Sequence, residues 1–495
     1  MQQSILSIAL ADLLTGIVIV DPIWDRQITG IKLDSRDIKS GDLFIAKCGT
    51  VVDGRKYINE AIAKGAAAVI AEIGDHQEFS HADCPIFQVE NLTLQIGKIA
   101  ARFYKYPSRH CEVIGITGTN GKTSVSHHLA FVMDSVDQPT AVIGTVGYGR
   151  LGQLIKSPLT TPDQITLQKW LAELVDQGIK RVMMEVSSHA LAQQRVNQVK
   201  YDTAIFTNLT HDHLDYHQTM QAYGEAKLKL FTQFALQYAV VNIDDLFSQT
   251  ILATLSANVK VITTSQKNPK ADVFAKNVEC HPLGLRAELI TLWGNAKLQC
   301  PLYGMFNLDN LLEVIATACL HEMPLITVLE KVAQLQPVSG RMQRYAIDSK
   351  SVFIDYAHTP DALIQVLNSL RQHFSAPIWC VFGCGGDRDR GKRPEMGAAA
   401  AKYADHIIIT NDNPRHETPE TIIAEIQAGI ETTKSVHVEA DRRLAIEFVL
   451  QHAKPHSVIL IAGKGHEDYQ LIGDKTLPFS DAEVIKNWAQ QDPVS

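Results

Sequence analysis

Residues 115–124 read Gly-Ile-Thr-Gly-Thr-Asn-Gly-Lys-Thr-Ser; the apolar run 113–117 leads into them and the helix-like segment 125–133 follows. A glycine-rich turn between a strand and a helix suits phosphate, because backbone N–H groups can approach its oxygens and the helix N-terminus adds positive potential. A lysine at this place neutralises β- and γ-phosphate charge, and the next hydroxyl can reach magnesium. We therefore predict a nucleoside triphosphate site at Gly118, Thr119, Asn120, Gly121, Lys122, Thr123 and Ser124.

The glycine spacing of this loop is irregular. The usual motif is G-x-x-x-x-G-K-[ST], but the residue five before Gly121 is Ile116. A generic nucleotide triphosphatase is therefore less favoured. A glycine-rich turn without a ligand remains an alternative, although Lys122 and Thr123 together weigh against it.

Short apolar runs alternate with helix-like segments on both sides of the loop, a pattern typical of parallel sheets covered by helices. A chain of 495 residues also exceeds what one hydrophobic core usually supports. We predict an α/β protein of three domains. These are residues 1–97, residues 98–337 with a central P-loop-type, mostly parallel sheet, and residues 338–495 with a Rossmann-like α/β fold.

The composition bears on the class of protein and its location. A formal net charge of −8 disfavours a protein that coats nucleic acid, since that task needs a basic face. The eight cysteines lack metal-like paired spacing and suit free thiols in a reducing cytoplasm. Asp12 interrupts the apolar stretch 5–20, which fits neither a signal peptide nor a membrane span. We expect a cytoplasmic protein without nucleic-acid partners or membrane insertion.

Polar groups gather after two further apolar runs. Glu185 ends one run, at the sheet edge where α/β proteins place ligand-binding groups, and is our first candidate for a magnesium ligand. The segment 207–217 follows the next run and contains three histidines and two aspartates, among them His213. Zinc is a rival for this cluster, but no thiolate joins it. A hydrogen-bonded loop without metal is the plain alternative.

The loop Thr-Gly-Thr-Asn-Gly-Lys-Thr-Ser resembles the ATP loop of the Mur ligases, the amino-acid-adding enzymes of bacterial cell-wall synthesis, and of their folylpolyglutamate synthetase relatives. Matching segments cover nearly the whole chain. The resemblance implies an ATP-dependent ligase that forms an amide bond through an acyl phosphate, requires Mg2+ and acts as a monomer. The small-molecule acceptor that it implies is UDP-N-acetylmuramoyl-L-alanyl-D-glutamate (UDP-MurNAc-L-Ala-D-Glu), bound by the first domain.

The same resemblance assigns catalytic and nucleotide-binding residues. Lys122, Glu185, His213 and Lys227 would be catalytic, and Thr123, Glu185, His213 and Lys227 would hold magnesium, with Lys227 carrying a carbamate derived from CO2. Nothing in the residues around Lys227 predicts this, since it would otherwise be a solvated helical lysine. The groups implied for adenine and for closure over ATP are Asn307, Asn310, Arg341, Asp355 and His358. An N-cap role for Asn307 is the competing interpretation.

The segment Asp412-Asn-Pro-Arg415 resembles the meso-2,6-diaminopimelate recognition motif of the family. An arginine fork pairs well with the distal carboxylate of this diamino acid, whereas L-lysine would leave Arg415 without its anion. The implied residues for diaminopimelate are Arg388, Asp412, Asn413, Pro414, Arg415, Gly463 and Glu467, which would bring it to the D-Glu γ-carboxylate. Those implied for the UDP-dipeptide are Leu33, Ser35, Thr50, Thr160, Thr161, Ser187, Gln193 and Arg195.

Three rival functions remain open. A lysine-adding ligase is the nearest of them, and a folylpolyglutamate synthetase would leave the segment 412–415 without a role. An ATP-gated binding or scaffold protein, which hydrolyses nucleotide without forming an amide, is the rival of a different class.

Overall fold

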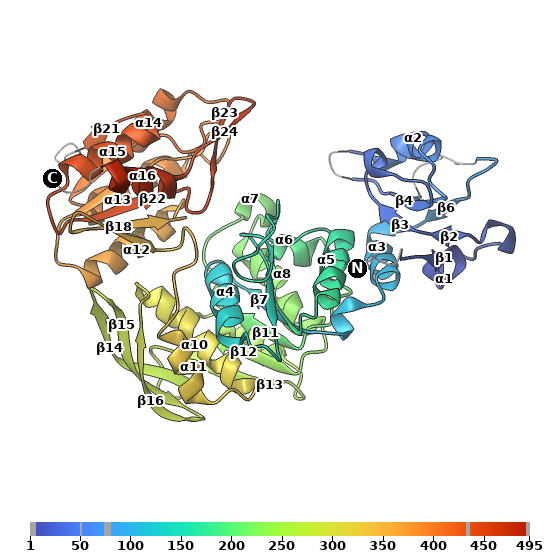
Figure 1. The fold of residues 1–495 in the computed structure, drawn as a ribbon, viewed down its shortest axis with the longest axis horizontal. Coiled ribbons are helices and arrows are strands. Elements are labelled where there is room, and N and C mark those ends of the chain that lie inside the picture. The colour runs from blue at the N-terminus through green and yellow to red at the C-terminus, as the bar shows by residue number, and fades with distance from the viewer. Residues whose placement is uncertain (1–5, 50–51, 74–80, 432–435, 492–495) are drawn as a thin grey trace. The chain divides into compact units, whose positions relative to one another are not determined.

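The computed structural model describes residues 6–49, 52–73, 81–431 and 436–491 (Figure 1). The chain divides into two compact units. Residues 1–122, 133–241 and 245–261 form the first unit, and residues 123–132, 242–244 and 262–495 form the second.

The first unit begins with a small parallel sheet whose strands run in the order β3-β4-β5-β6. Successive side chains of a strand point to opposite faces. Leu43 and Ile45 therefore pack with α1 and α3, while Phe44 and Ala46 pack with α2 on the other face. The elements are β1 (Ile8–Ala9), α1 (Leu10–Leu14), β2 (Gln27–Ile28), β3 (Gly30–Lys32), β4 (Asp42–Ala46), α2 (Ile58–Ala63), β5 (Ala68–Glu72), β6 (Ile86–Val89) and α3 (Leu92–Phe103).

A larger set of strands in the first unit runs in the order β12-β11-β7-β10-β8-β9. Strand β7 pairs in parallel with both β10 and β11, and neither follows it directly in the chain. Ligands of open α/β sheets bind outside the carboxyl ends of strands where the strand order reverses in this way. The elements are β7 (Glu112–Thr117), β8 (Thr140–Ile143), β9 (Tyr148–Gly149), α5 (Gln164–Asp176), β10 (Arg181–Glu185), α6 (Ser188–Ala192), β11 (Thr203–Phe206), α7 (Leu214–His217), α8 (Met220–Thr232), β12 (Tyr238–Asn242) and α9 (Ser248–Thr254).

The second unit contains α4 (Lys122–Met133) in large part, β13 (Lys260–Ser265) and a ribbon of antiparallel strands. The ribbon consists of β14 (Val273–His281), β15 (Gly284–Thr291) and β16 (Gly294–Cys300) and is not among the strands predicted from apolar runs. Buried and exposed residues mix along β14, so no continuous apolar run marks it. Two helices follow, α10 (Met305–Leu320) and α11 (Leu325–Val332).

The last sheet lies within the second unit and has the order β17-β18-β22-β19-β20-β21, with only β17 antiparallel. Phe353 packs with α12, α13 and α14, whereas its neighbours Val352 and Ile354 pack with α15 and α16, so helices cover both faces. The elements are β17 (Gln343–Ile347), β18 (Lys350–Asp355), α12 (Pro360–His373), β19 (Ile378–Phe382), α13 (Lys392–Tyr403), β20 (His406–Ile409), α14 (Pro419–Gln427), β21 (Val436–Val438), α15 (Arg442–His452), β22 (Val458–Ala462) and α16 (Asp481–Gln491). A hairpin of β23 (Tyr469–Ile472) and β24 (Lys475–Pro478) stands outside this sheet.

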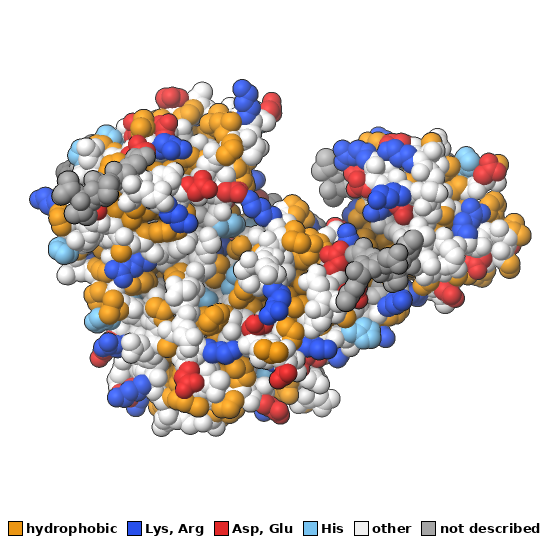
Figure 2. Space-filling model, in the orientation of Figure 1, with side chains coloured by type: hydrophobic (Ala, Val, Ile, Leu, Met, Phe, Trp, Pro, Cys, Tyr) orange, Lys and Arg blue, Asp and Glu red, His pale blue; other side chains and the backbone are white. Residues whose placement is uncertain are grey.

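These sheets confirm the predicted α/β class with largely parallel strands. The surface in Figure 2 carries acidic and basic side chains interspersed with apolar and neutral ones. Among the described helices, none is both long and apolar enough to cross a membrane.

Candidate functional site

The predicted phosphate loop follows β7 and ends at the start of α4. Asn208, in the segment after β11, fixes its shape by accepting from the Thr119 N–H through its carbonyl and from the Asn120 N–H through Oδ1, both at 2.9 Å. A Cβ atom on Gly118 would lie 1.8 Å from Oγ1 of Thr207, so only glycine fits there. Asn208 and Thr207 were not predicted as site residues from the sequence, because their contacts join segments far apart in the chain.

Two lysines converge on one carbonyl of this loop. Lys122 Nζ and Lys227 Nζ each donate to the Gly118 carbonyl at 2.7 Å. Lys227 is buried, and its ammonium lies 4.4 Å from the ring centroid of Tyr223. Burial lowers the pKa of Lys227 well below its ordinary value, and the charge of Lys122 lowers it further. The structure therefore places Lys227 beside the phosphate loop rather than on a solvated helix face.

Glu185 ends β10 with a fully buried side chain. Its Oε1 accepts from the Thr145 N–H at 2.9 Å and its Oε2 from the Thr145 hydroxyl at 3.0 Å. A Cβ on Gly144 would lie 2.1 Å from Oε1, so the chain makes room for this carboxylate with a glycine. A hard cation that keeps several waters needs few protein ligands, and a fixed carboxylate at a sheet edge suits it.

His213 lies in a cluster of aromatic rings after β11. It adopts a left-handed backbone, φ +52°, directly before α7. Its ring centroid lies 4.8 Å from that of His189. Burial lowers the pKa of His213, and it lowers the pKa of His189 to about 4. A neutral imidazole is the form that binds metals.

The residues present fit a magnesium ion only if other ligands complete its shell. Within the described part of the chain, no group of three or more His, Cys, Asp or Glu side chains is arranged to hold a metal ion. Phosphate oxygens and waters would therefore have to supply the remaining ligands, which is the usual arrangement for Mg2+.

Most of the residues predicted for the UDP-dipeptide lie in segments next to the larger sheet, where hydrogen bonds join them to one another. The Thr161 hydroxyl donates to the Glu185 carbonyl at 2.8 Å, and Arg195 Nη1 donates to the Thr161 carbonyl at 2.9 Å. Arg195 Nε also donates to Gln193 at 2.9 Å, while the Ser187 N–H donates to the Thr161 hydroxyl at 3.1 Å. These groups thus gather at the carboxyl end of β10.

Of the remaining dipeptide residues in the described ranges, Thr160 lies near Glu185 as well, and the other two lie in the N-terminal sheet region. The Thr160 hydroxyl is 3.0 Å from that of Thr145, close to Glu185. In the N-terminal sheet region, Leu33 packs against the apolar core and the buried Ser35 donates to Glu60 at 3.1 Å. Thr50 lies outside the described residues.

The residues predicted for adenine lie inside α10. The helix is capped by Gly304 without a side-chain bond, so the alternative of an Asn307 N-cap is wrong. Asn307 instead donates from Nδ2 to the Tyr303 carbonyl at 2.8 Å, and Asn310 donates to Asn307 Oδ1 at 3.2 Å. The two buried amides therefore form one short chain of hydrogen bonds.

The residues predicted to close over ATP occupy the start of the last sheet region. Asp355 ends β18, and its carboxylate accepts from the N–H groups of Met342 at 2.7 Å and Ala357 at 2.8 Å. Burial raises the pKa of Asp355. Arg341 lies 4.7 Å above the ring of Tyr356, and His358 Nδ1 is 2.7 Å from the Tyr356 carbonyl. The structure brings these three residues together.

Hydrogen bonds to other segments hold residues 412–415 of the predicted diamino-acid site in place. Asn413 accepts from Lys464 Nζ at 3.1 Å and the Leu471 N–H at 3.0 Å, and donates to Glu467 at 2.9 Å. Lys464 is fully buried and was not predicted from the sequence. The signal available in the sequence was its three-residue spacing from Glu467. In the structure the two residues form an ion pair of 3.0 Å.

Arg415 has the left-handed φ of +51°, and both its N–H and its carbonyl form backbone bonds, one with β23 and one with the residue directly after that strand. Its N–H donates to the Leu471 carbonyl at 3.0 Å, and its carbonyl accepts from the Gly473 N–H at 2.7 Å. Its guanidinium donates to the Gly386 carbonyl at 2.8 Å, and none of the carboxylates in the described ranges pairs with it. An arginine held in this way can bind a carboxylate from outside the chain.

The other predicted diamino-acid residues lie within this segment or in other turns of the same unit. Arg388 is exposed in the turn region after β19. Asp412 and Pro414 are buried, and a Cβ on Gly463 would lie 2.5 Å from Asp412 Oδ2. Burial raises the pKa of Asp412.

Comparisons with known proteins agree with this arrangement. Family models match residues 27–104 (Mur ligase family, catalytic domain), 116–318 (Mur ligase middle domain) and 340–465 (Mur ligase, glutamate ligase domain). The chain belongs to the Mur ligase family. It is therefore an ATP-dependent ligase that forms amide bonds, which confirms the reaction class implied by the family resemblance.

Curated relatives of this Mur ligase share its length. A protein of Coxiella burnetii named UDP-N-acetylmuramoyl-L-alanyl-D-glutamate--2,6-diaminopimelate ligase is 48% identical over 469 residues, 93% of this chain and 96% of that one. A protein of the same name from Pseudomonas aeruginosa is 44% identical, over 93% of this chain and 94% of that one. A solved structure of that name, 35% identical, covers 99% of this chain and 100% of that chain with a TM-score of 0.73.

Proposed function

We propose that this Mur ligase adds meso-2,6-diaminopimelate to the D-Glu γ-carboxylate of UDP-MurNAc-L-Ala-D-Glu, in the cytoplasmic synthesis of peptidoglycan precursors. The observation that carries the proposal is Arg415, which is fixed on both sides by backbone bonds and has no carboxylate partner among the described residues. The names of the relatives support the same substrates.

The reaction has two steps. The γ-carboxylate attacks the γ-phosphorus of ATP, an O–P bond forms, and ADP leaves. The diamino acid's neutral amine then attacks the acyl carbon, a C–N bond forms, the C–O bond to phosphate breaks, and the amine loses a proton. The chain's contribution is positioning and charge neutralisation, so Lys122 would face the phosphates while residues 412–415 orient the amine.

Magnesium would be held by Thr123, Glu185, His213 and a carbamate on Lys227, and when bound it would neutralise charge between phosphate and carboxylate. Burial supports the carbamate, because CO2 reacts with the neutral amine and burial favours that form. Carbamylation would also remove the Lys227 ammonium, the second cation at the Gly118 carbonyl, and place an anion near the Lys122 ammonium.

The domain bounds 1–97, 98–337 and 338–495 belong to this proposal. The first domain would bind the uridine diphosphate end of the acceptor through residues near Ser35. The second would bind ATP, and the third would bind the diamino acid and contribute Arg341, Asp355 and His358 to the nucleotide. We propose that the enzyme acts as a monomer.

The test is phosphate release measured together with product mass, in the complete mixture and with each substrate omitted. We expect phosphate and the UDP-MurNAc-tripeptide in equal amounts, and neither when the UDP-dipeptide is left out. Phosphate release at the full rate without the UDP-dipeptide and diamino acid would instead support the ATP-gated binding protein.

A further inference from the structure

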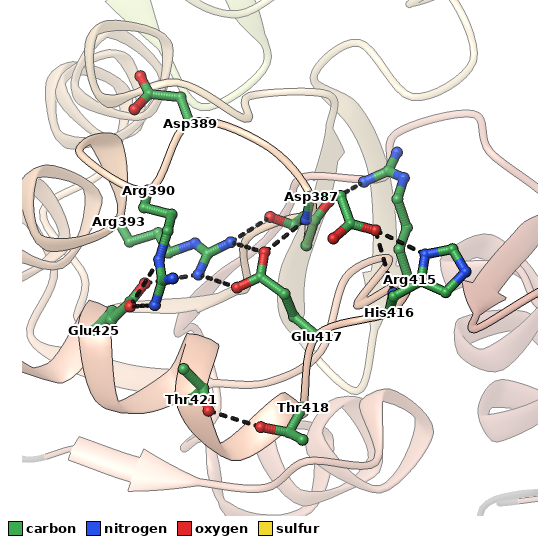
Figure 3. Close-up of polar contacts among 12 residues, drawn as sticks. Asp387, Asp389, Arg390, Arg393, Arg415, His416, Glu417, Thr418, Thr421 and Glu425 are labelled. Carbon is green, nitrogen blue, oxygen red and sulfur yellow. Dashed lines mark hydrogen bonds and ion pairs between the residues drawn. The ribbon is translucent and has the colours of Figure 1, made fainter.

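Arg393, the second residue of α13, is a fully buried arginine to which the proposed reaction assigns no role. Its guanidinium forms a fork on Glu417, with Nη1 donating to Oε2 at 2.9 Å and Nη2 to Oε1 at 2.7 Å. Such bidentate pairs fix the orientation of both partners. Figure 3 shows Arg393 between Glu417 and a second carboxylate, Glu425, whose Oε2 accepts from Nη1 at 2.6 Å.

The Arg393–Glu417 pair also holds the turn at residues 385–387, which follows β19. Arg393 Nη2 donates to the Gly385 carbonyl at 3.2 Å. At the other end of the turn, the Asp387 N–H donates to Glu417 Oε1 at 2.6 Å. The ion pair therefore binds both ends of this turn.

The same turn supports Arg415. The Gly386 carbonyl accepts from Arg415 Nη1 at 2.8 Å, and the Gly386 N–H donates to the Asn413 carbonyl at 2.9 Å. A Cβ on Gly386 would lie 1.9 Å from the Pro414 carbonyl oxygen, so the two backbones are in close contact. A shift of the turn would move the guanidinium of Arg415 with it.

We propose that the Arg393–Glu417 ion pair positions the recognition arginine: it holds the turn 385–387 so that Arg415 presents its guanidinium to the distal carboxylate of the incoming diamino acid. The inference rests on the proposed function of Arg415. Arg393 and Glu417 are positioning residues, because they act on the substrate only through the turn. Their effect is therefore specific to one of the three substrates.

The test compares Glu417→Gln with Glu425→Gln in the full-length enzyme. Both variants remove one carboxylate from Arg393, but of these two glutamates Glu417 is the one that also accepts a hydrogen bond from the turn, at the Asp387 N–H. We expect Glu417→Gln to raise the KM for meso-2,6-diaminopimelate about tenfold or more and to lower its preference over L-lysine, with the KM values for ATP and UDP-dipeptide within about twofold. Glu425→Gln should leave the diaminopimelate KM within about twofold.

Equal effects of the two variants would overturn the inference and indicate a structural role. A fall in kcat with no specific rise in the KM for diaminopimelate would do the same. If Glu417→Gln does not fold, Arg393→Lys gives the second reading, because lysine keeps the charge but cannot span both oxygens of Glu417 and the turn. If neither variant yields folded enzyme, the pair serves the fold and the proposal fails. A wild-type enzyme that does not use diaminopimelate as a substrate would contradict the proposed function instead.

Discussion

The backbone of Arg415 is held in a conformation that non-glycine residues seldom adopt, with φ at +51°. Bonds to Leu471 and Gly473 on either side compensate for this strain. The side chain then donates to the Gly386 carbonyl instead of pairing with an acid. At the scale of single residues, specificity thus depends on an arginine whose guanidinium the fold orients but which no carboxylate of the described residues neutralises.

Replacing Arg415 with lysine should lower kcat/KM for diaminopimelate by about 10²-fold or more, because an ammonium cannot form the two parallel bonds of a guanidinium. Steady-state rates with diaminopimelate and L-lysine measure the effect. Arg390→Lys is the matched control. Arg390 is an exposed arginine of the same unit, and it pairs with Glu425 of the chain. A comparable loss in both variants would contradict the role assigned to Arg415.

Lys227 should carry a carbamate when the enzyme is active. Enzyme equilibrated with ¹³C-bicarbonate should give a carbamate carbonyl signal by NMR, and Lys227→Arg should abolish it together with about 10²-fold of the activity. Lys229→Arg, on the same helix, serves as the control. A signal that persists in Lys227→Arg would assign the carbamate to another amine.

At the scale of elements, the apolar runs predicted strands well. The run 113–117 falls within β7, which begins one residue earlier, and the run that Glu185 ends corresponds to β10. The ribbon β14–β16 was missed because its residues are partly exposed and lack a continuous apolar stretch. A continuous apolar run marks a strand that is buried on both faces, so strands with one exposed face are not found by searching for such runs.

The hairpin β23–β24 should act on the diamino-acid site through Gly473. This glycine has a φ of +56° and open space around its Cβ position, so Gly473→Ala introduces backbone strain alone, about 1 kcal/mol. We expect a small fall in thermal stability and a higher KM for diaminopimelate. Gly178→Ala is a matched control, with φ +83° and equally open space after α5. A raised diaminopimelate KM in Gly178→Ala as well would refute a local effect of the hairpin.

At the scale of the whole molecule, the sequence offered candidates for the residues that carry the chemistry, but it gave little sign of the residues that hold them in place. Glu185 ends one buried strand and Arg415 comes after another, and such positions can be recognised in the sequence. The Arg393–Glu417 pair and the contact of Lys227 with Gly118 join distant segments. Local pattern gives no sign of such contacts, since Arg393 alone looks like a solvated helical cation.

Stability should depend on pH through His128, which is buried in α4. Burial lowers its pKa to about 3. An unfolded histidine, with an ordinary pKa of about 6.5, binds a proton more readily, so the folded state loses stability as pH falls from about 6.5 towards 3. At pH 5.5 the loss should be on the order of 1 kcal/mol, and it begins below the unfolded pKa.

Urea unfolding midpoints at pH 7.5 and pH 5.5 measure this dependence. His128→Leu should reduce the difference between the two midpoints, whereas His110→Leu, at an exposed histidine, should leave it unchanged. An unchanged difference in His128→Leu would mean that other groups produce the pH dependence.

The central claim is that this Mur ligase selects a diamino acid with a distal carboxylate. The most direct measurement supplies equimolar meso-2,6-diaminopimelate and L-lysine with ATP, Mg2+ and UDP-MurNAc-L-Ala-D-Glu, and determines the product masses. The account predicts at least about a 10²-fold excess of the diaminopimelate-containing tripeptide. Equal amounts of the two tripeptides, or an excess of the lysine product, would contradict it.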